Sequence, residues 1–229
     1  NKGSLTLNDV TVNDAKVLAM QKASAFVGNL MGNSTLTVND CAITNSTFSA
    51  YFMVAPIAAY GTSAQVTLNG IKLENNTVQV VEQSGSNYTY DEQTGAEYWE
   101  GDLNACPTAL FYDGSSTAGS GAVWAPVAEV NGYQYDTLAG AIAAAGDGDT
   151  VTLVDDCTVS SAITVDKNLT LDLNGHKVIN HMTADRPFQV TADVDFIIDG
   201  TAAGSGMTIP DSNTGSYGFI KISAAATVT

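Results

Sequence analysis

Two adjacent carboxylates and a histidine are the residues of this sequence best suited to acid–base chemistry. Asp155-Asp156 is followed by Gly175-His176-Lys177 and then by Ile220-Lys221. Two carboxylates that flank a glycosidic bond can hydrolyse it, one as acid and the other as base. A chain with 24 acidic residues and 21 glycines also contains such short motifs by chance. We therefore predict that Asp155, Asp156, His176 and Lys221 form no active site.

Tyrosine and tryptophan residues are concentrated between positions 82 and 126. Exposed aromatic side chains in an insertion of this kind can stack on sugar rings. The simpler interpretation is that they cover the open end of the first coil, formed by residues 1–81. The candidates for glycan contact are Tyr88, Tyr90, Tyr98, Trp99 and Trp124.

The three cysteines, Cys41, Cys106 and Cys157, cannot form a closed set of disulfides. Cys41 occupies the same repeat position as Val10 and Ile71. We therefore expect it to be a buried apolar residue and not a nucleophile.

The elements that would position these residues are strands, because the sequence repeats itself. Residues 5–12, 36–43 and 66–73 align without gaps and begin 31 and 30 residues apart. A fourth copy occupies 171–178, and Phe196–Gly200 and Ala226–Thr229 are weaker copies. Repeats of this length without a recurring helix favour a coil of parallel strands.

Each copy alternates apolar and polar residues, as a strand with one buried face does. An asparagine stands where the alternation breaks, at Asn8, Asn39, Asn69 and Asn174. We expect a bend there, with the asparagine amides hydrogen-bonded from one coil to the next. The inward column should contain Val10, Cys41, Ile71 and His176.

The fold class is therefore all-β, a right-handed parallel β-helix in two modules. We predict coils over 1–81, an aromatic-rich, loop-like insertion or linker over 82–126, and a second module over 127–229. A short helix at about 137–145 should begin at Asp136 or Thr137, end at Gly146 and cover the edge of the second module.

Residues 127–180 resemble the opening of pectin-lyase-like β-helix domains found in large bacterial cell-surface proteins. The likeness rests on Asn131-Gly132, on Thr137 to Ala145, on Gly148 to Leu153, and on Ile163 to His176. It implies a parallel β-helix and an extracellular bacterial location. It does not imply lyase activity, because this fold carries many functions.

Polygalacturonases on the same fold carry an Asn-Thr-Asp, an Asp-Asp, a Gly-His-Gly and an Arg-Ile-Lys motif in that order. Here the first motif is missing upstream of Asp155, and Phe219 stands where the arginine should be. A polysaccharide lyase needs a basic residue on the sheet face, yet the single arginine, Arg186, precedes Pro187 on an expected loop. We expect no enzymatic activity. A carbohydrate-binding or carbohydrate-cleaving β-helix is the alternative.

The net charge of −16 disfavours nucleic acid as a partner. No apolar run is long enough to cross a membrane. We expect no cofactor. Calcium at clustered carboxylates is the one alternative, although no EF-hand-type loop is present. The expected function is an extracellular structural or adhesive element whose partners are a host or plant glycan, a surface protein or another copy of the chain.

Self-association is expected to be head-to-tail. Residues 1–8 and 222–229 both have the pattern of an incomplete coil, and uncovered coil ends invite further strands. The predicted contact residues are Leu5 and Leu7 at one end and Ala226 and Val228 at the other. Such an arrangement would build a filament.

Overall fold

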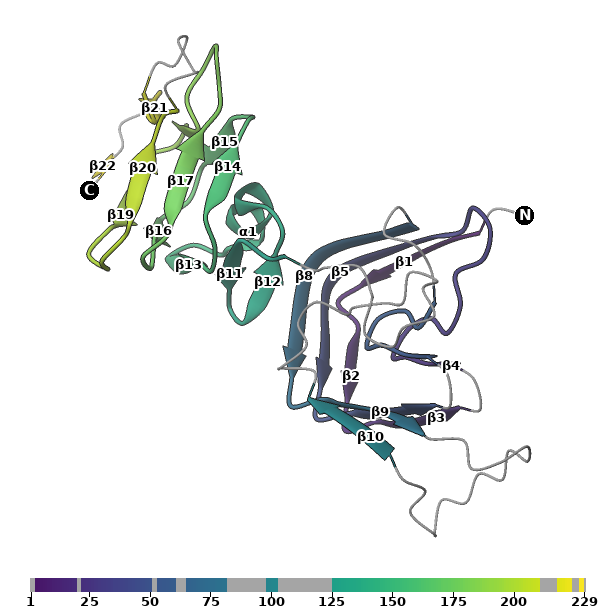
Figure 1. Ribbon diagram of the computed structural model, residues 1–229. Coiled ribbons are helices and arrows are strands. Elements are labelled where there is room, and N and C mark those ends of the chain that lie inside the picture. Colours follow the sequence, from purple (N-terminus) through teal and green to yellow (C-terminus); the bar gives the residue numbers. More distant parts are fainter. Residues whose placement is uncertain are drawn as a thin grey trace. The chain divides into compact units, whose positions relative to one another are not determined.

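The computed structural model describes residues 3–19, 22–50, 53–60, 65–81, 98–102, 125–210, 218–223 and 227–228. The chain divides into two compact units, Asn1–Ala125 and Pro126–Thr229. In each unit, short parallel strands stack into coils around a hydrophobic core (Figure 1). The fold is therefore the parallel β-helix predicted from the repeats.

Unit 1 has three parallel sheets, one for each side of the coil. Long bent strands lie side by side in the first sheet (Figure 1). Its strands are β1 (Ser4–Asn8), β2 (Thr11–Asn13), β5 (Thr35–Thr44) and β8 (Val66–Glu74). The second sheet contains β3 (Lys16–Ala19), β6 (Thr47–Ala50) and β9 (Thr77–Val81), and the third contains β4 (Lys22–Ala23) and β7 (Met53–Val54).

The strand register of unit 1 follows the sequence repeat. Leu5 pairs with Leu36, and Leu36 pairs with Val66, at the predicted spacings of 31 and 30 residues. Cys41 pairs with Ile71, and their side chains are 0% and 2% exposed. Val10 packs against the same core. The inward column is thus confirmed for these three residues.

Residues 98–102 differ from the expectation of a loop-like insertion. They form a strand, β10 (Tyr98–Asp102), which pairs antiparallel with β9, Tyr98 opposite Val81. The sequence pattern hides this strand because Gly101 and two acidic residues interrupt any alternation of apolar residues.

Unit 2 begins with a hairpin of β11 (Ala128–Val130) and β12 (Tyr133–Tyr135). Asn131 and Gly132 join these strands with φ angles of 54° and 82°, and a tight hairpin turn of this kind favours Asn-Gly.

Three parallel sheets follow. The first contains β13 (Asp149–Leu153), β16 (Leu169–Asp172), β19 (Asp195–Asp199) and β22 (Thr227–Val228). The second contains β14 (Cys157–Val159), β17 (Lys177–Asn180) and β20 (Gly206–Thr208). The third contains β15 (Ile163–Val165), β18 (Phe188–Val190) and β21 (Ile220–Ile222).

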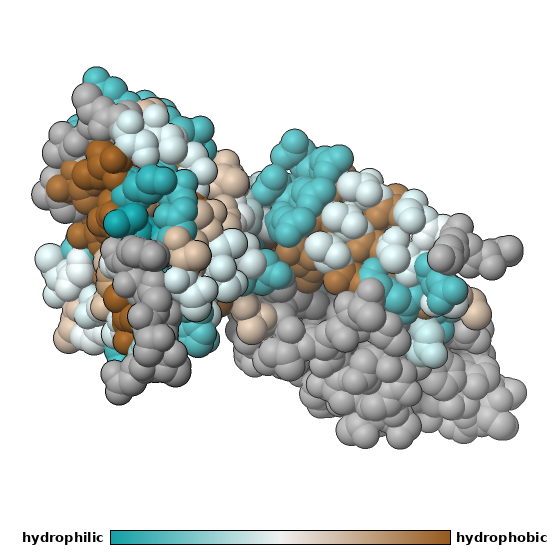
Figure 2. All heavy atoms as spheres, turned by 90° about the horizontal axis from the view of Figure 1, so that it is seen from above, coloured by the Kyte–Doolittle hydropathy of each residue, from teal (hydrophilic) through white to brown (hydrophobic). Residues whose placement is uncertain are grey.

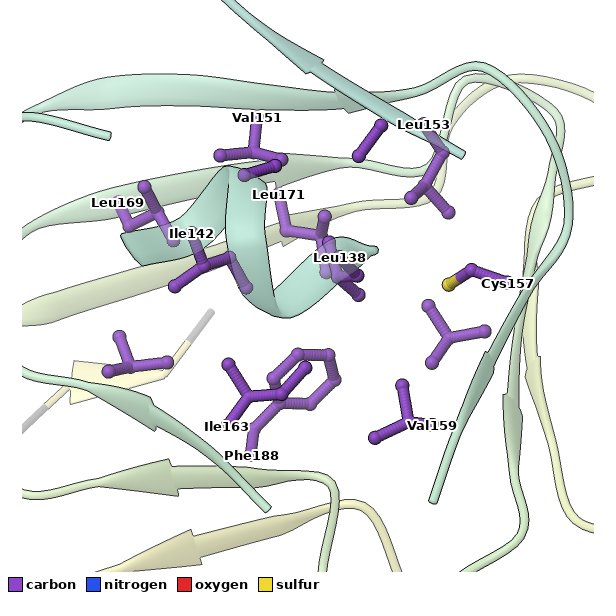
Figure 3. Packing of buried hydrophobic residues seen from close by; sticks show 14 of the residues in the cluster. Leu138, Ile142, Val151, Leu153, Cys157, Val159, Ile163, Leu169, Leu171 and Phe188 are labelled. Carbon is purple, nitrogen blue, oxygen red and sulfur yellow. The ribbon is translucent and has the colours of Figure 1, made fainter. Parts of the chain in front are cut away.

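The predicted helix is present as α1 (Leu138–Ala144). Thr137 caps it, since its Oγ1 accepts a hydrogen bond from the Gly140 backbone N–H at 3.1 Å. Figure 3 shows Leu138 and Ile142 among Val151, Leu169, Leu171 and other core residues of the strands. The helix therefore covers the core of unit 2, as predicted.

The register of unit 2 corrects the alignment of the weaker copies. That alignment placed Phe196 beside Leu171, whereas Phe196 pairs with Leu169 and Val228. The strands are thus shifted by two residues. Because side chains alternate with a period of two, a shift by two residues buries the same face of each strand. The apolar–polar alternation of the sequence therefore fits both registers equally well.

Among the described residues, no helix is long and apolar enough to span a membrane.

Candidate functional site

Asparagine side chains link the three coils of unit 1 along the outer surface. Asn39 Nδ2 donates to Asn8 Oδ1 at 2.7 Å, and Asn69 Nδ2 donates to Asn39 Oδ1 at 2.8 Å. This is the predicted ladder. The left-handed backbone conformation belongs to the following residues, Asp9, Asp40 and Gly70, and not to the asparagines themselves.

A row of threonines lies beside the asparagine ladder. Thr6 pairs with Thr37, and Thr37 pairs with Thr67, while the neighbouring Leu36 and Val38 face the core. Adjacent strands are about 4.8 Å apart, and alternate residues along a strand are about 6.7 Å apart. Hydroxyl and amide groups therefore repeat on a regular grid. We call this surface the outer ladder, made of Thr6, Asn8, Thr37, Asn39, Thr67 and Asn69.

A second ladder at the next corner of the coil was not predicted. Asn45 Nδ2 and Thr44 Oγ1 both donate to Asn13 Oδ1, at 3.0 and 2.8 Å, and Asn75 Nδ2 donates to Asn45 Oδ1 at 3.3 Å. The buried Asn76 closes the same corner by donating to the Ile43 carbonyl at 2.6 Å. The recurrence of Asn45 and Asn75 at the 30-residue spacing of the repeat was the available signal, whereas Asn13 stands opposite Thr44.

The visible surface of both units mixes hydrophilic, intermediate and hydrophobic residues (Figure 2). In Figure 2, hydrophilic and intermediate residues cover most of the described atoms on the viewed face, with hydrophobic residues showing between them.

Burial makes two of the cysteines poor nucleophiles. Desolvation raises the pKa of the Cys41 thiol, and its Sγ donates to the Asn39 carbonyl at 3.2 Å. Desolvation, with the neighbouring charge of Asp156, raises the pKa of Cys157 to about 11. Both are free thiols whose thiolate form is disfavoured. The third, Cys106, lies outside the described residues.

His176 does not occupy the inward column, and this prediction was wrong. Its side chain is 32% exposed, with Nδ1 3.7 Å from Asp156 Oδ1. Asn174 and Gly175 both adopt left-handed conformations, whereas the corresponding corners of unit 1 contain one left-handed residue each. Leu173 and Val178 are buried instead. Asn174 also leaves the predicted ladder, since its Nδ2 donates to the Leu153 carbonyl at 3.0 Å.

The structure brings together three of the four residues considered for hydrolysis. Ligand atoms of Asp155, Asp156 and His176 all lie within 4.8 Å of one another. Lys221 belongs to β21, in a different sheet from the strands that follow Asp156 and His176. The two carboxylates also accept hydrogen bonds from backbone N–H groups. Asp155 Oδ1 accepts from the Asp156 N–H at 2.7 Å, and Asp156 Oδ1 accepts from the Lys177 N–H at 2.8 Å.

The predicted glycan-contact residues fall largely outside the described part of the chain. Tyr88, Tyr90 and Trp124 lie outside it. Tyr98 and Trp99 belong to β10.

Of the predicted assembly residues, Leu5 is 42% exposed, whereas Leu7 packs against the core of unit 1 and Val228 against the core of unit 2. Ala226 lies outside the described residues.

A small pocket of about 190 Å³ lies beside the start of α1 in unit 2. Leu138, Cys157 and Ile163 line it together with Asp136, whose pKa is raised by desolvation. Pockets for drug-sized ligands usually exceed about 300 Å³, so this one is smaller than a typical ligand site.

The sequence did not predict the stabilising contacts of two residues of unit 2, Lys167 and Asp149. Lys167 Nζ donates to the Ala145 carbonyl at 2.8 Å and approaches those of Ala143 and Ile142 at 3.3 and 3.4 Å. Asp149 Oδ2 accepts from the Gly146 N–H at 2.7 Å and from Asn131 at 2.8 Å. The hydrogen bond from the Gly146 N–H, and to a lesser extent the one from Asn131, holds the pKa of this carboxyl below its usual value.

No protein-family model matches the chain, and the curated proteins and solved structures compared with it contain no significant match. The fold and the chemistry of its surface are therefore what indicate the function of the chain.

Proposed function

We propose that this chain is a structural or adhesive β-helix element of an extracellular bacterial surface protein. The observation that carries the proposal is the outer ladder, whose threonines and asparagines repeat in register over three coils. A surface of this kind suits repeated weak contacts along an extended partner. The resemblance of residues 127–180 to bacterial surface domains supports the extracellular location.

The contacts between coils favour a rigid element. In unit 1, main-chain pairing, two side-chain ladders and a continuous hydrophobic core connect each coil to the next. Solenoids gain stability from such neighbour contacts and present long regular surfaces. The charge of −16 keeps these surfaces solvated and disfavours anionic partners.

A carbohydrate-binding or carbohydrate-cleaving β-helix is the alternative function. The proximity of Asp155, Asp156 and His176 is the observation in its favour. Inverting glycosidases hold their carboxylates about 6.5–9.5 Å apart, on opposite sides of the bond. Asp155 and Asp156 are adjacent and already accept hydrogen bonds from backbone N–H groups, so they fit that geometry poorly. Within this alternative, we therefore favour carbohydrate binding over carbohydrate cleavage.

Head-to-tail self-association is part of the proposal. Leu5 is 42% exposed although its neighbour in the column, Leu36, is completely buried. An apolar residue left open on a strand of this sheet offers a contact to another copy of the chain.

Binding to a panel of plant and host polysaccharides tests the adhesive form of the proposal. Retention on a polysaccharide without release of product supports an adhesive element. Retention should be lost on replacing Thr37 and Thr67 with lysine and kept on replacing Lys177, an exposed residue of unit 2. Absence of binding to every polysaccharide leaves the structural form, and release of oligosaccharide contradicts both.

A further inference from the structure

Asp155, Asp156 and His176 meet where two successive coils of unit 2 turn the same corner. The two aspartates follow β13 and directly precede β14, and His176 directly precedes β17. Strands β14 and β17 are parallel, with Cys157 opposite Val178. This pairing holds the residues before each strand side by side, so one ligand atom of each side chain lies within 4.8 Å of the others.

The separation of His176 and Asp156 suits two ligands of one metal ion. Nδ1 and Oδ1 are 3.7 Å apart, too far for a direct hydrogen bond. Ligands about 2.0–2.2 Å from one zinc ion stand about 3.4 Å apart at a tetrahedral angle and about 4.2 Å apart when opposite. The observed distance falls between these values, so an ion can bridge the pair without rearrangement of the coils.

Backbone contacts hold the candidate ligands in place. The Lys177 N–H donates to Asp156 Oδ1, and the Asp156 N–H donates to Asp155 Oδ1. The His176 carbonyl accepts from the Gly206 N–H of the next coil at 3.1 Å. A carboxylate oxygen has a second lone pair, so these bonds orient the ligands and leave room for a metal.

We propose that Asp155, Asp156 and His176 bind a divalent transition-metal ion of the zinc class, with water completing its coordination. The imidazole selects such an ion over Ca²⁺ and Mg²⁺, which prefer oxygen ligands. The ligands come from two coils, so the ion cross-links them. This inference goes beyond the proposed function and does not depend on it.

The chain provides its own matched control, because it contains only two histidines, His176 and His181. His181 is exposed and is not part of this or any other group of potential metal ligands among the described residues. The full-length chain is studied with Cys106→Ser as background, which removes the thiol outside the described residues. Zinc is titrated calorimetrically, and Co²⁺ is followed by its visible absorption.

We expect one Zn²⁺ per chain, with an affinity that falls at least tenfold in His176→Ala and changes less than twofold in His181→Ala. Asp156→Asn should also weaken binding tenfold or more, and it retains the Oδ1 acceptor for the Lys177 N–H. In nitrogen-15 NMR spectra, Zn²⁺ should shift the His176 imidazole and leave that of His181 in place. Millimolar Ca²⁺ should not compete.

Circular dichroism of the metal-free variants checks that they fold, and Asp156→Asn decides the question if His176→Ala does not fold. Binding of equal strength in the folded variants and the parent chain would overturn the proposal. Failure of the parent chain to bind stoichiometric Zn²⁺ would do the same.

Discussion

The side-chain amide of Asn39 donates to Asn8 Oδ1 at 2.7 Å across 31 residues of sequence. Asn39 also accepts from Asn69 at 2.8 Å, so it stands at the centre of a ladder through three coils. The bonds form only when the strands pair in the observed register, because a shift by one residue would turn the amides to the other face. The ladder thus follows the repeat in the sequence and links three coils of unit 1 along their outer surface.

Asn39→Ala should destabilise unit 1 by about 1 kcal/mol, because it removes two partly exposed hydrogen bonds. Asn69→Ala removes one ladder bond and should cost about half as much. Hydrogen exchange of residues 35–44 measures the effect within unit 1. Thr67→Val is the control, since no side-chain hydrogen bond of Thr67 is found among the described residues. Equal exchange rates in Asn39→Ala and Thr67→Val would show that the ladder contributes nothing.

Lys167→Met should loosen α1 at its carboxyl end. The ammonium group lies 2.8 Å from the Ala145 carbonyl, and a cation at that end of a helix contributes about 1 kcal/mol. Faster hydrogen exchange in 138–146, with unit 1 unchanged, is the expected result. Lys221→Met, at an exposed position on β21, serves as the comparison. Similar exchange in both variants would mean that Lys167 does not hold the helix.

Cys157 should make unit 2 less stable at alkaline pH. Burial raises its pKa from the ordinary value of 9.0 to about 11. Below pH 9 the thiol is protonated in both the folded and the unfolded chain. Between pH 9 and 11 only the unfolded chain loses the proton, so the free energy of unfolding falls by about 2 kcal/mol.

Cys157→Ala should therefore be less stable than the parent chain at pH 8, and the difference should shrink as the pH rises to 11. Urea unfolding of both proteins at several pH values gives this difference directly. A difference that stays constant would refute the account of the buried thiol.

Leu5→Lys should prevent head-to-tail assembly. Leu5 is a cleaner target than Val228, which packs against the core of unit 2 and whose replacement would perturb the fold. The parent chain should form rods in negative-stain images, and these rods should be absent from Leu5→Lys. They should persist in Met31→Lys, which changes a residue that is 67% exposed in a turn. A parent chain that stays monomeric at high concentration would end the filament hypothesis.

The sequence predicted unit 1 well because the spacings of its repeats, 31 and 30 residues, differ by one residue only. The spacing alone gave the pairing of Leu5, Leu36 and Val66 and the burial of Cys41. In unit 2 the coils differ in length, and alternation with a period of two does not distinguish Leu171 from Leu169 as the partner of Phe196.

The candidate metal site could be predicted only in part. Asp155, Asp156 and His176 stood out by residue type. Their proximity depends on the two-residue left-handed turn at Asn174 and Gly175, which the alignment treated as an ordinary copy of the unit 1 corner. The role of Lys167 depends on a contact across more than 20 residues, for which the local sequence carries no signal.

Release of reducing ends from polysaccharides tests the central proposal most directly. The chain is incubated with polygalacturonate, other plant polysaccharides and host glycans, with and without added Zn²⁺, and reducing ends and unsaturated products are followed over time. A structural or adhesive element should release nothing above the rate of the heat-unfolded chain. Sustained release that is lost in Asp155→Asn and His176→Ala would contradict the proposal and identify the cluster as a catalytic site.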